Sequence, residues 1–132
     1  MTVLMRHTAW ILIVAFGISL IYELYRATSK AGTSRHDSMR AFVVQGIPLY
    51  TLAGVVIALL FTGREWAAAV GLIFSVAMIC VSIFYYNPQI MLARQPGIVD
   101  WFEDLVFTGL LFVAAALLLY AMCGTSVRLV LE

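Results

Sequence analysis

The sequence predicts an all-α integral membrane protein, a four-helix transmembrane bundle with short loops that forms a single domain over residues 1–132. Hydrophobic residues make up 64% of the chain and charged residues 11%, whereas a soluble domain is about half apolar and about a quarter charged. Four apolar runs are almost free of Asp, Glu, Lys and Arg, and the stretches between them hold nearly all of these residues. Segregation of this kind is typical of a chain whose solvent is a lipid bilayer.

Four segments approach the ~20 residues that a helix needs to cross the hydrocarbon layer, at residues 9–25, 42–62, 66–86 and 105–123. Helices are the expected spanning elements, because backbone amides in lipid must be hydrogen-bonded within their own segment. The first segment is the shortest and carries Glu23 near its end, so a cleaved signal peptide is the alternative for it. Trp10, Trp66 and Trp101 all fall at expected interfaces, which supports these boundaries.

The link between the second and third segments, Gly63-Arg64-Glu65, is so short that the two helices must form an antiparallel hairpin. With four spans, both termini lie on the same side of the membrane as this link. The opposite side holds five of the eight basic residues, namely Arg26, Lys30, Arg35, Arg40 and Arg94. The positive-inside rule therefore predicts that this side is cytoplasmic and that the termini lie on the non-cytoplasmic side.

Small residues recur every four positions along the third segment, at Ala67, Gly71 and Ser75. Small side chains at this spacing let two helix backbones approach closely in a membrane, where no hydrophobic effect drives helices together. They are expected to pack against another helix of the same chain. A seam between copies of the chain is the alternative.

The second segment is interrupted by Pro48, which removes an amide donor and is expected to kink the helix. Gln45 and Gly46 come directly before it, and Tyr50 follows. A kink beside a polar side chain either opens a pocket between helices or only shapes the bundle, and the residues favour the second interpretation.

The connection between the third and fourth segments ends in an acidic group. Asn87-Pro88 is expected to end the third helix, since the residue before a proline is pushed out of helical geometry. Asp100, Glu103 and Asp104 then follow at i, i+3 and i+4. Three such carboxylates suit a site for a hard cation or an acid–base group. The favoured interpretation is a helix cap, because Asp100-x-x-Glu103 directly precedes an apolar run and Asp104 adds negative charge to the first turn.

The first loop is basic and lies on the same predicted side as the acidic group. Its residues Arg26, Lys30, Arg35 and Arg40 are candidates for holding an anionic headgroup, because juxtamembrane basic clusters attract anionic lipids. They are also candidates for pairing with the three carboxylates across the mouth of the bundle. The simplest interpretation is that they only set the topology.

Several kinds of chemistry lack their residues. None of the four segments carries an ionisable side chain near its middle, and Glu23 is close enough to an interface to reach it or to pair with Arg26. His7 and His36 are expected on opposite faces of the bilayer, so they cannot share a metal ion or ligate a buried haem. No phosphate-binding loop, dinucleotide fingerprint or nucleophile elbow is present. We therefore expect no cofactor and no metal site, and the net charge of +1 predicts no attraction to nucleic acid.

Two membrane families provide comparisons. The run from Arg35 to Tyr50 resembles the loop and second helix of the membrane-associated eicosanoid and glutathione metabolism family, whose members are trimeric four-helix bundles. Gln45 and Phe42 stand where that family has Glu and Asn, so the sequence is not assigned to it. Small multidrug transporters have a carboxylate in the middle of the first helix, whereas Glu23 lies near its end.

Three functions follow from these patterns. The leading hypothesis is a non-enzymatic accessory or scaffold subunit, whose partners are the lipid bilayer and other membrane subunits or further copies of the chain. The first alternative is a membrane-embedded enzyme acting on a lipophilic substrate at the cytoplasmic face. Its entrance would be lined by Gln45, Tyr50, Asp100, Glu103 and Asp104. The second alternative is a small channel or carrier for a neutral solute that enters beside Gln45 and Pro48.

Overall fold

The computed structural model describes residues 2–32, 38–92 and 96–131, and the side chains of residues 3–32, 38–92 and 96–123. Helix accounts for 91% of the described residues, and no strand occurs among them. The elements in chain order are α1 (Thr2–Thr28), α2 (Met39–Ala41), η1 (Phe42–Gly46), α3 (Ile47–Phe61), α4 (Glu65–Val81), η2 (Ser82–Met91) and α5 (Ile98–Leu131), where η marks a π-helical segment.

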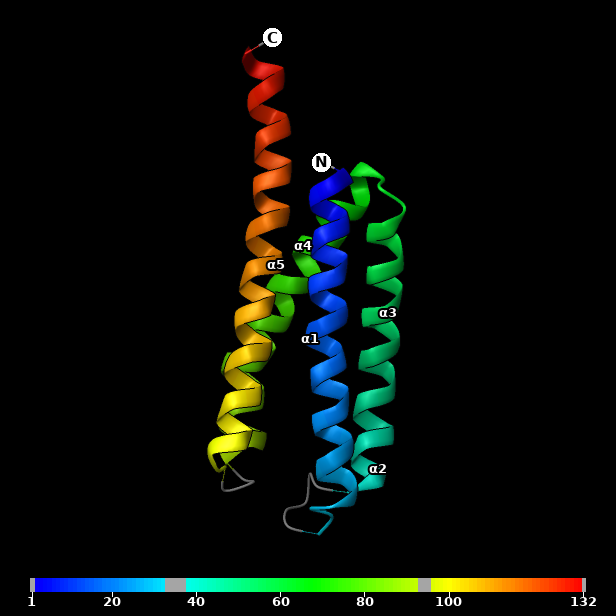
Figure 1. Ribbon diagram of the computed structural model, residues 1–132, viewed down its shortest axis with the longest axis vertical. Helices are drawn as coiled ribbons and strands as arrows, with labels where there is room; N and C mark the ends of the chain where they lie inside the picture. The colour runs from blue at the N-terminus through cyan, green and yellow to red at the C-terminus, as the bar shows by residue number, and fades with distance from the viewer. Residues whose placement is uncertain (1, 33–37, 93–95, 132) are drawn as a thin grey trace.

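These elements form four helices that are long and apolar enough to cross a membrane, as the sequence predicts. They are Val3–Thr28, Met39–Phe61, Glu65–Met91 and Ile98–Cys123. Each contains 23 to 27 residues, which at about 1.5 Å per residue exceeds the thickness of the hydrocarbon layer. The helices run alternately up and down, and α5 extends beyond the other three at the end that holds the termini (Figure 1).

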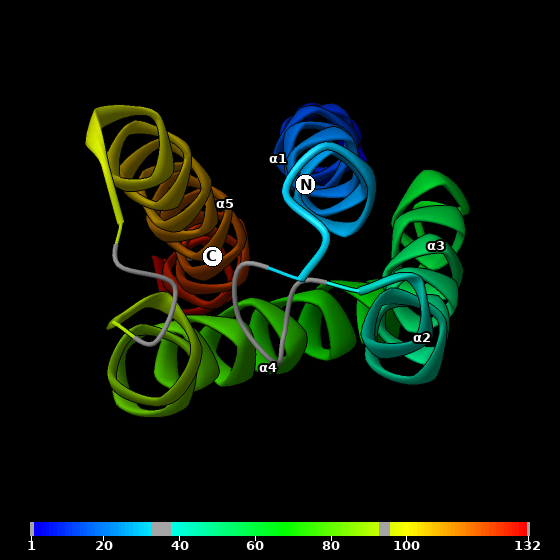
Figure 2. The same ribbon diagram turned by 90° about the horizontal axis from the view of Figure 1, so that it is seen from below.

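The first and last helices lie side by side, as do α1 and α3, and α4 packs against both α3 and α5, as the end-on view shows (Figure 2). The core between them is built around the ring of Phe16, whose centroid is 5.2 Å from that of Phe107 and 5.6 Å from that of Phe74. Alanines fill the narrower layers toward the termini, where Ala9 and Ala67 are fully buried. Aromatic packing therefore fixes the middle of the bundle, and small residues allow it to close at one end.

The predicted hairpin between the second and third spans is present. Helix α3 ends at Phe61, Thr62 follows as its C-cap, and Gly63 adopts a positive φ of 74°. That conformation is strained for a residue with a Cβ atom, and a glycine just beyond the C-cap is the usual way to end a helix and reverse the chain. Helix α4 then begins at Glu65.

The structure places the small residues of the third span inside the chain's own bundle. Ala67, Gly71 and Ser75 are all buried. A Cβ atom added to Gly71 would lie 2.9 Å from the Cδ2 atom of Leu60 and 3.0 Å from the Cδ1 atom of Leu118. The glycine therefore allows α3 and α5 to approach α4 from two sides.

The third span does not end at Asn87-Pro88, so that prediction is wrong. Its helical path continues through Pro88 to Met91 as the π-helical segment η2. A proline ring clashes with the carbonyl group one turn earlier in an α-helix, whereas the wider π turn bonds i to i+5 and moves that carbonyl group away. A π-helical segment also stands beside Pro48: η1 ends at Gly46, and the proline lies in the first turn of α3, which begins at Ile47.

Candidate functional site

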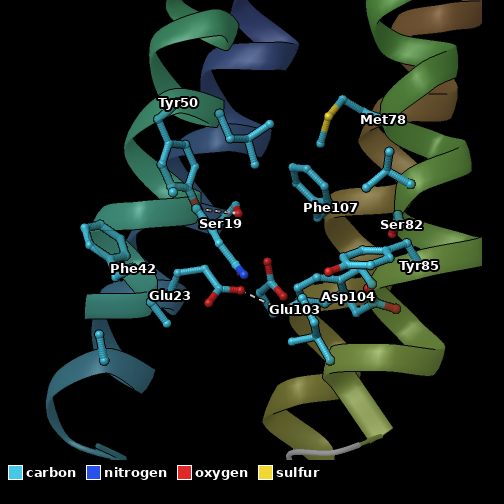
Figure 3. Close-up of a pocket in the computed structure, with 18 residues that line it drawn as sticks. Ser19, Glu23, Phe42, Tyr50, Met78, Ser82, Tyr85, Glu103, Asp104 and Phe107 are labelled. Carbon is cyan, nitrogen blue, oxygen red and sulfur yellow. Dashed lines mark hydrogen bonds between the residues drawn. The ribbon is translucent and has the colours of Figure 1, made fainter. Parts of the chain in front are cut away.

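A cavity of about 410 Å³ lies between the four helices, in the half of the bundle where α1 and η2 end and α2 and α5 begin, called the loop end below. It is lined by eighteen residues that come from every span (Figure 3). Three of its lining side chains are carboxylates, Glu23, Glu103 and Asp104. Five are aromatic, namely Phe42, Tyr50, Tyr85, Tyr86 and Phe107.

Helix α1 contributes one stripe of its surface to the cavity. Ser19, Glu23 and Ala27 are spaced four residues apart, so they lie one above another on the same face of the helix. Two of the three are hydrogen-bonded across the cavity to other spans. The hydroxyl groups of Ser19 and Tyr50 are 2.9 Å apart, and the hydroxyl of Tyr86 donates to Oε1 of Glu23 over 2.7 Å.

The second span faces the cavity through η1 and the first turn of α3. Phe42, Gln45 and Gly46 come from the π-helical segment, and Tyr50 lies one turn beyond it. The absence of a side chain at Gly46 leaves room for the Tyr50 ring, whose Cε2 atom would lie 3.3 Å from an added Cβ atom. The ring can then stand beside Phe42, at a centroid distance of 6.3 Å.

Helix α5 forms the fourth side of the cavity and carries its two most deeply buried acids. Glu103 is 8% exposed and Asp104 is 3% exposed, and both come from the second turn of α5. With the Asn87 amide oriented so that its nitrogen faces the carboxylate, Nδ2 lies 2.9 and 3.1 Å from the two oxygens of Asp104. This orientation is the one that satisfies both partners, because the opposite one would bring acceptors together.

A buried ion pair lies at the loop end of the bundle, beside the cavity. A guanidinium nitrogen of Arg26 is 3.5 Å from Oδ1 of Asp100, and the two side chains are only 5% and 12% exposed. The hydroxyl of Tyr22 also donates to Oδ1, and the backbone N–H of Gly97 donates to Oδ2 over 2.8 Å. Asp100 is therefore held by three partners, which leaves it poorly placed to act as an acid or base in the cavity.

The structure separates the candidate residues that the sequence grouped. Gln45, Tyr50, Glu103 and Asp104 line the cavity, while Asp100 belongs to the neighbouring ion pair. Among the candidate anion contacts, Arg26 is buried against Asp100, and Lys30 and Arg40 are exposed at the same end of the bundle. Arg35 lies outside the described residues.

The capping pattern predicted for Asp100-x-x-Glu103 is wrong in its register. Helix α5 begins at Ile98, so Gly97 takes the N-cap position and Asp100 the third helical position. Asp100 bonds back to the N–H of Gly97, which is the acceptor half of a capping box. Glu103 therefore lies a turn further into the helix, where it faces the cavity rather than the helix end.

Several residues of the site were not singled out as candidates, above all Ser19 and the tyrosines of η2. The i, i+4 spacing of Ser19 and Glu23 is a signal that was available, because it predicts one polar stripe on an otherwise apolar helix. Tyr86 gave no such signal, because a tyrosine near the end of a span is ordinarily an interface residue.

The arrangement can bind an amphipathic molecule, since apolar walls and polar groups meet in one partly open cavity. The part of the chain that the structure describes contains no group of three or more His, Cys, Asp or Glu side chains placed to hold a metal ion. Comparisons with protein-family models, with curated proteins and with solved structures find no match to this chain.

Proposed function

We propose that this chain is an integral membrane protein that binds a small amphipathic molecule in its central cavity and carries it across the bilayer. The observation that carries the proposal is the cavity itself, about 410 Å³ in volume and lined by all four spans. Binding sites for small molecules typically range from about 300 to 1,000 Å³ and combine apolar walls with a few polar groups. The proposal departs from the accessory subunit favoured by the sequence, because a packing subunit has no need of such a space.

The two π-helical segments support a role that involves movement. η1 and η2 belong to the second and third spans, and both contribute side chains to the cavity wall. π-helical turns are rare and occur frequently at functional sites. A segment of this kind returns to α-helical geometry by a shift of one residue, which rotates the side chains beyond it by about 100°. Such a shift would change the shape of the cavity without separating the helices.

The cavity is proposed to open toward the cytoplasm. Arg26, Lys30 and Arg40 all lie at the loop end of the bundle, close to the acidic part of the cavity, and the positive-inside rule assigns that end to the cytoplasm. Cysteines introduced at the exposed Lys30 and Arg64, in a cysteine-free background, test this. A membrane-impermeant maleimide added to intact cells should label only the cysteine at position 64, and labelling at position 30 would refute the orientation.

Uptake into proteoliposomes tests the function. The solutes are small benzyl compounds that are cationic, neutral or anionic, and at least one is expected to show saturable uptake. Ala41→Trp should abolish that uptake, because Ala41 lines the cavity and an indole would fill it. Ala58→Trp is the matched control, because Ala58 is exposed on the same span and away from the cavity. Absence of saturable uptake for every solute, or equal uptake by the two variants, would refute the proposal.

An accessory subunit remains the second candidate, and one observation favours it. Only 17% of the most apolar window of the second span is buried within the chain, against 44% for the third span. A helix so exposed is either covered by lipid or by another membrane protein. Purification in a mild detergent distinguishes the two: other chains should co-migrate with a subunit, whereas a monodisperse monomer argues for lipid.

A further inference from the structure

The central cavity opens through the side of the bundle, between the second and third spans. Three of its lining side chains are exposed, Gln45 of η1, Val81 of α4 and Tyr85 of η2. The lining residues that α1 and α5 contribute are buried, apart from the half-buried Glu23. Figure 3 shows Phe42 and Tyr85, one from each of the two spans, on opposite sides of this space. The open side of the cavity therefore lies between η1 and η2.

The second and third spans separate toward the loop end. They pack against each other through α3 and α4, on the side of the hairpin. Nearer the loop end, η1 packs against α1, α2 and α3, whereas η2 packs against α4. Figure 2, which looks at the bundle from that end, shows α2 well apart from the yellow-green helix of η2. The opening is the wedge that this divergence leaves.

The opening lies within the membrane and not at its surface. The second span begins at Met39 and the third ends at Met91, so Gln45 and Tyr85 each stand six residues inside the loop end of their span, a depth of roughly 9 Å. The two spans contain 23 and 27 residues, which exceeds the hydrocarbon thickness by about 5 to 10 Å over both ends together. Both side chains therefore start below the head-group region, among acyl chains.

Each side of the opening carries a neutral polar group. The side-chain amide of Gln45 and the hydroxyl of Tyr85 make no hydrogen bond with the residues that the structure describes. Polar groups surrounded by hydrocarbon are costly unless a partner satisfies them. An amide and a phenol both donate and accept hydrogen bonds, so a hydroxyl group suits them. Neither offers a countercharge, so these two groups cannot compensate the desolvation of an ionic partner.

The volume of the cavity limits how much of a lipid it can take. About 410 Å³ is near the lower end of the range of about 300 to 1,000 Å³ for small-molecule sites. A small head group fits such a space, whereas long acyl chains do not. The chains of a bound lipid must therefore pass out through the opening and stay in the bilayer.

From this arrangement we infer that the ligand is a membrane lipid with a small, uncharged, hydroxyl-bearing head, which enters the cavity sideways from the leaflet at the loop end. The head lies between Gln45 and Tyr85, and the chain passes beside Val81 into the bilayer. The inference rests on the proposed function, and it adds the class of the ligand and its route of entry. The ligand comes from the lipid and not from the aqueous phase.

The accessibility of spin labels tests the route. Nitroxides are attached to Gln45→Cys and Tyr85→Cys, each in a background free of the two native cysteines, and measured by power saturation in phosphatidylcholine proteoliposomes. Both labels should collide more often with oxygen, which concentrates in hydrocarbon, than with a water-soluble nickel chelate. Labels at Ile73→Cys and Lys30→Cys are the lipid-facing and water-facing controls. A preference for the chelate at positions 45 and 85 would refute the lateral opening.

Binding of three lipids with the same chain tests the ligand class. 1-Hexadecylglycerol has a neutral diol head, hexadecyltrimethylammonium a cationic head and hexadecyl phosphate an anionic head. Each is titrated into the detergent-solubilised wild-type protein and followed by native mass spectrometry. Hexadecylglycerol should bind about fivefold more tightly than either charged lipid, or better. Equal or tighter binding of a charged lipid would overturn the assignment of an uncharged head.

Two variants locate the head of the lipid. Gln45→Leu and Tyr85→Phe each remove one of the two polar groups and should weaken the binding of hexadecylglycerol about fivefold. Gln89→Leu and Tyr120→Phe are the matched controls, because both residues are exposed and neither lines the cavity. The controls should bind as the wild type does. If all four variants bind equally well, the head does not lie at the opening and the inference is wrong.

The outcomes distinguish this inference from the function on which it rests. Saturable uptake that Ala41→Trp abolishes, together with water-exposed labels at positions 45 and 85, would support the carrier and refute lateral entry. Lipid-exposed labels at both positions, with hexadecylglycerol the tightest ligand, would support the inference. If none of the three lipids binds and no solute is taken up, the proposed function fails and the inference fails with it.

Discussion

Removing the charge of Asp100 should destabilise the bundle strongly, because it takes a buried carboxylate away from the buried guanidinium of Arg26. The two side chains are 3.5 Å apart and 5% and 12% exposed. At that distance two unit charges attract each other by roughly 5 kcal/mol if the effective dielectric constant is about 20. Breaking a buried pair by removing one partner costs about 3 to 5 kcal/mol, so we expect Asp100→Asn to lose about that much. Asparagine has one acceptor oxygen, so it can keep the bond from Tyr22 or the bond from Gly97 but not both, and roughly 1 kcal/mol of the loss comes from the other bond.

The assay is reversible unfolding by titration with sodium dodecyl sulfate in nonionic micelles, followed by far-ultraviolet circular dichroism. Arg26→Met should be similarly destabilising, whereas the double variant Arg26→Met/Asp100→Asn should lose less than the sum of the two, since it removes both charges of the pair together. Glu65→Gln, at an exposed carboxylate, should stay within about 0.5 kcal/mol of the wild type. If the losses of the two single variants simply add in the double variant, the pair is not coupled and the reasoning is wrong.

Further predictions use the same titration. Gly71→Leu should be less stable than Gly109→Leu by roughly 1 to 3 kcal/mol, because an added Cβ atom at Gly71 meets two buried leucines, whereas one at Gly109 meets nothing within 4 Å. Equal stability of these variants would contradict the close approach of the helices. Ser75→Ala should raise stability by roughly 1 kcal/mol, because the Ser75 hydroxyl is buried without a hydrogen-bond partner among the described residues. Ser82→Ala should lower stability by a similar amount, since its hydroxyl is hydrogen-bonded; the opposite order would show that these bonds are misassigned.

The four long apolar helices and the hairpin were predictable from the sequence, because a bilayer leaves few choices to such segments. A chain with four long apolar segments must form helices there, and the three-residue link at Gly63 permits only an antiparallel arrangement. The helix ends were less predictable. Pro88 is a strong signal to stop an α-helix, but it carries no information about whether a π turn will accommodate it. Asp100 likewise could cap α5 either as the N-cap residue or as the third residue of the helix. The sequence fits both positions, and the structure has the second.

The site was only partly predictable, because the sequence does not fix how each helix is rotated about its own axis and therefore which residues face the cavity. Glu103 and Asp104 were candidates because acidic residues beside a span are conspicuous. Glu23 was identified as a polar residue in an apolar segment, but its expected neighbour was Arg26, one turn away on the same helix. The structure also brings Tyr86 to it, from η2. A π-helical segment inserts a residue into the turn, so the ordinary period of 3.6 no longer tells which face the residues beyond it occupy.

The cavity carboxylates also explain how the loop half of the bundle is held together. Glu23 accepts from Tyr86, and Asp104 from Asn87, so each acid of this kind links its own helix to the third span. Donors from another helix thus satisfy acids that are turned into the bundle, and they join the helices at this level.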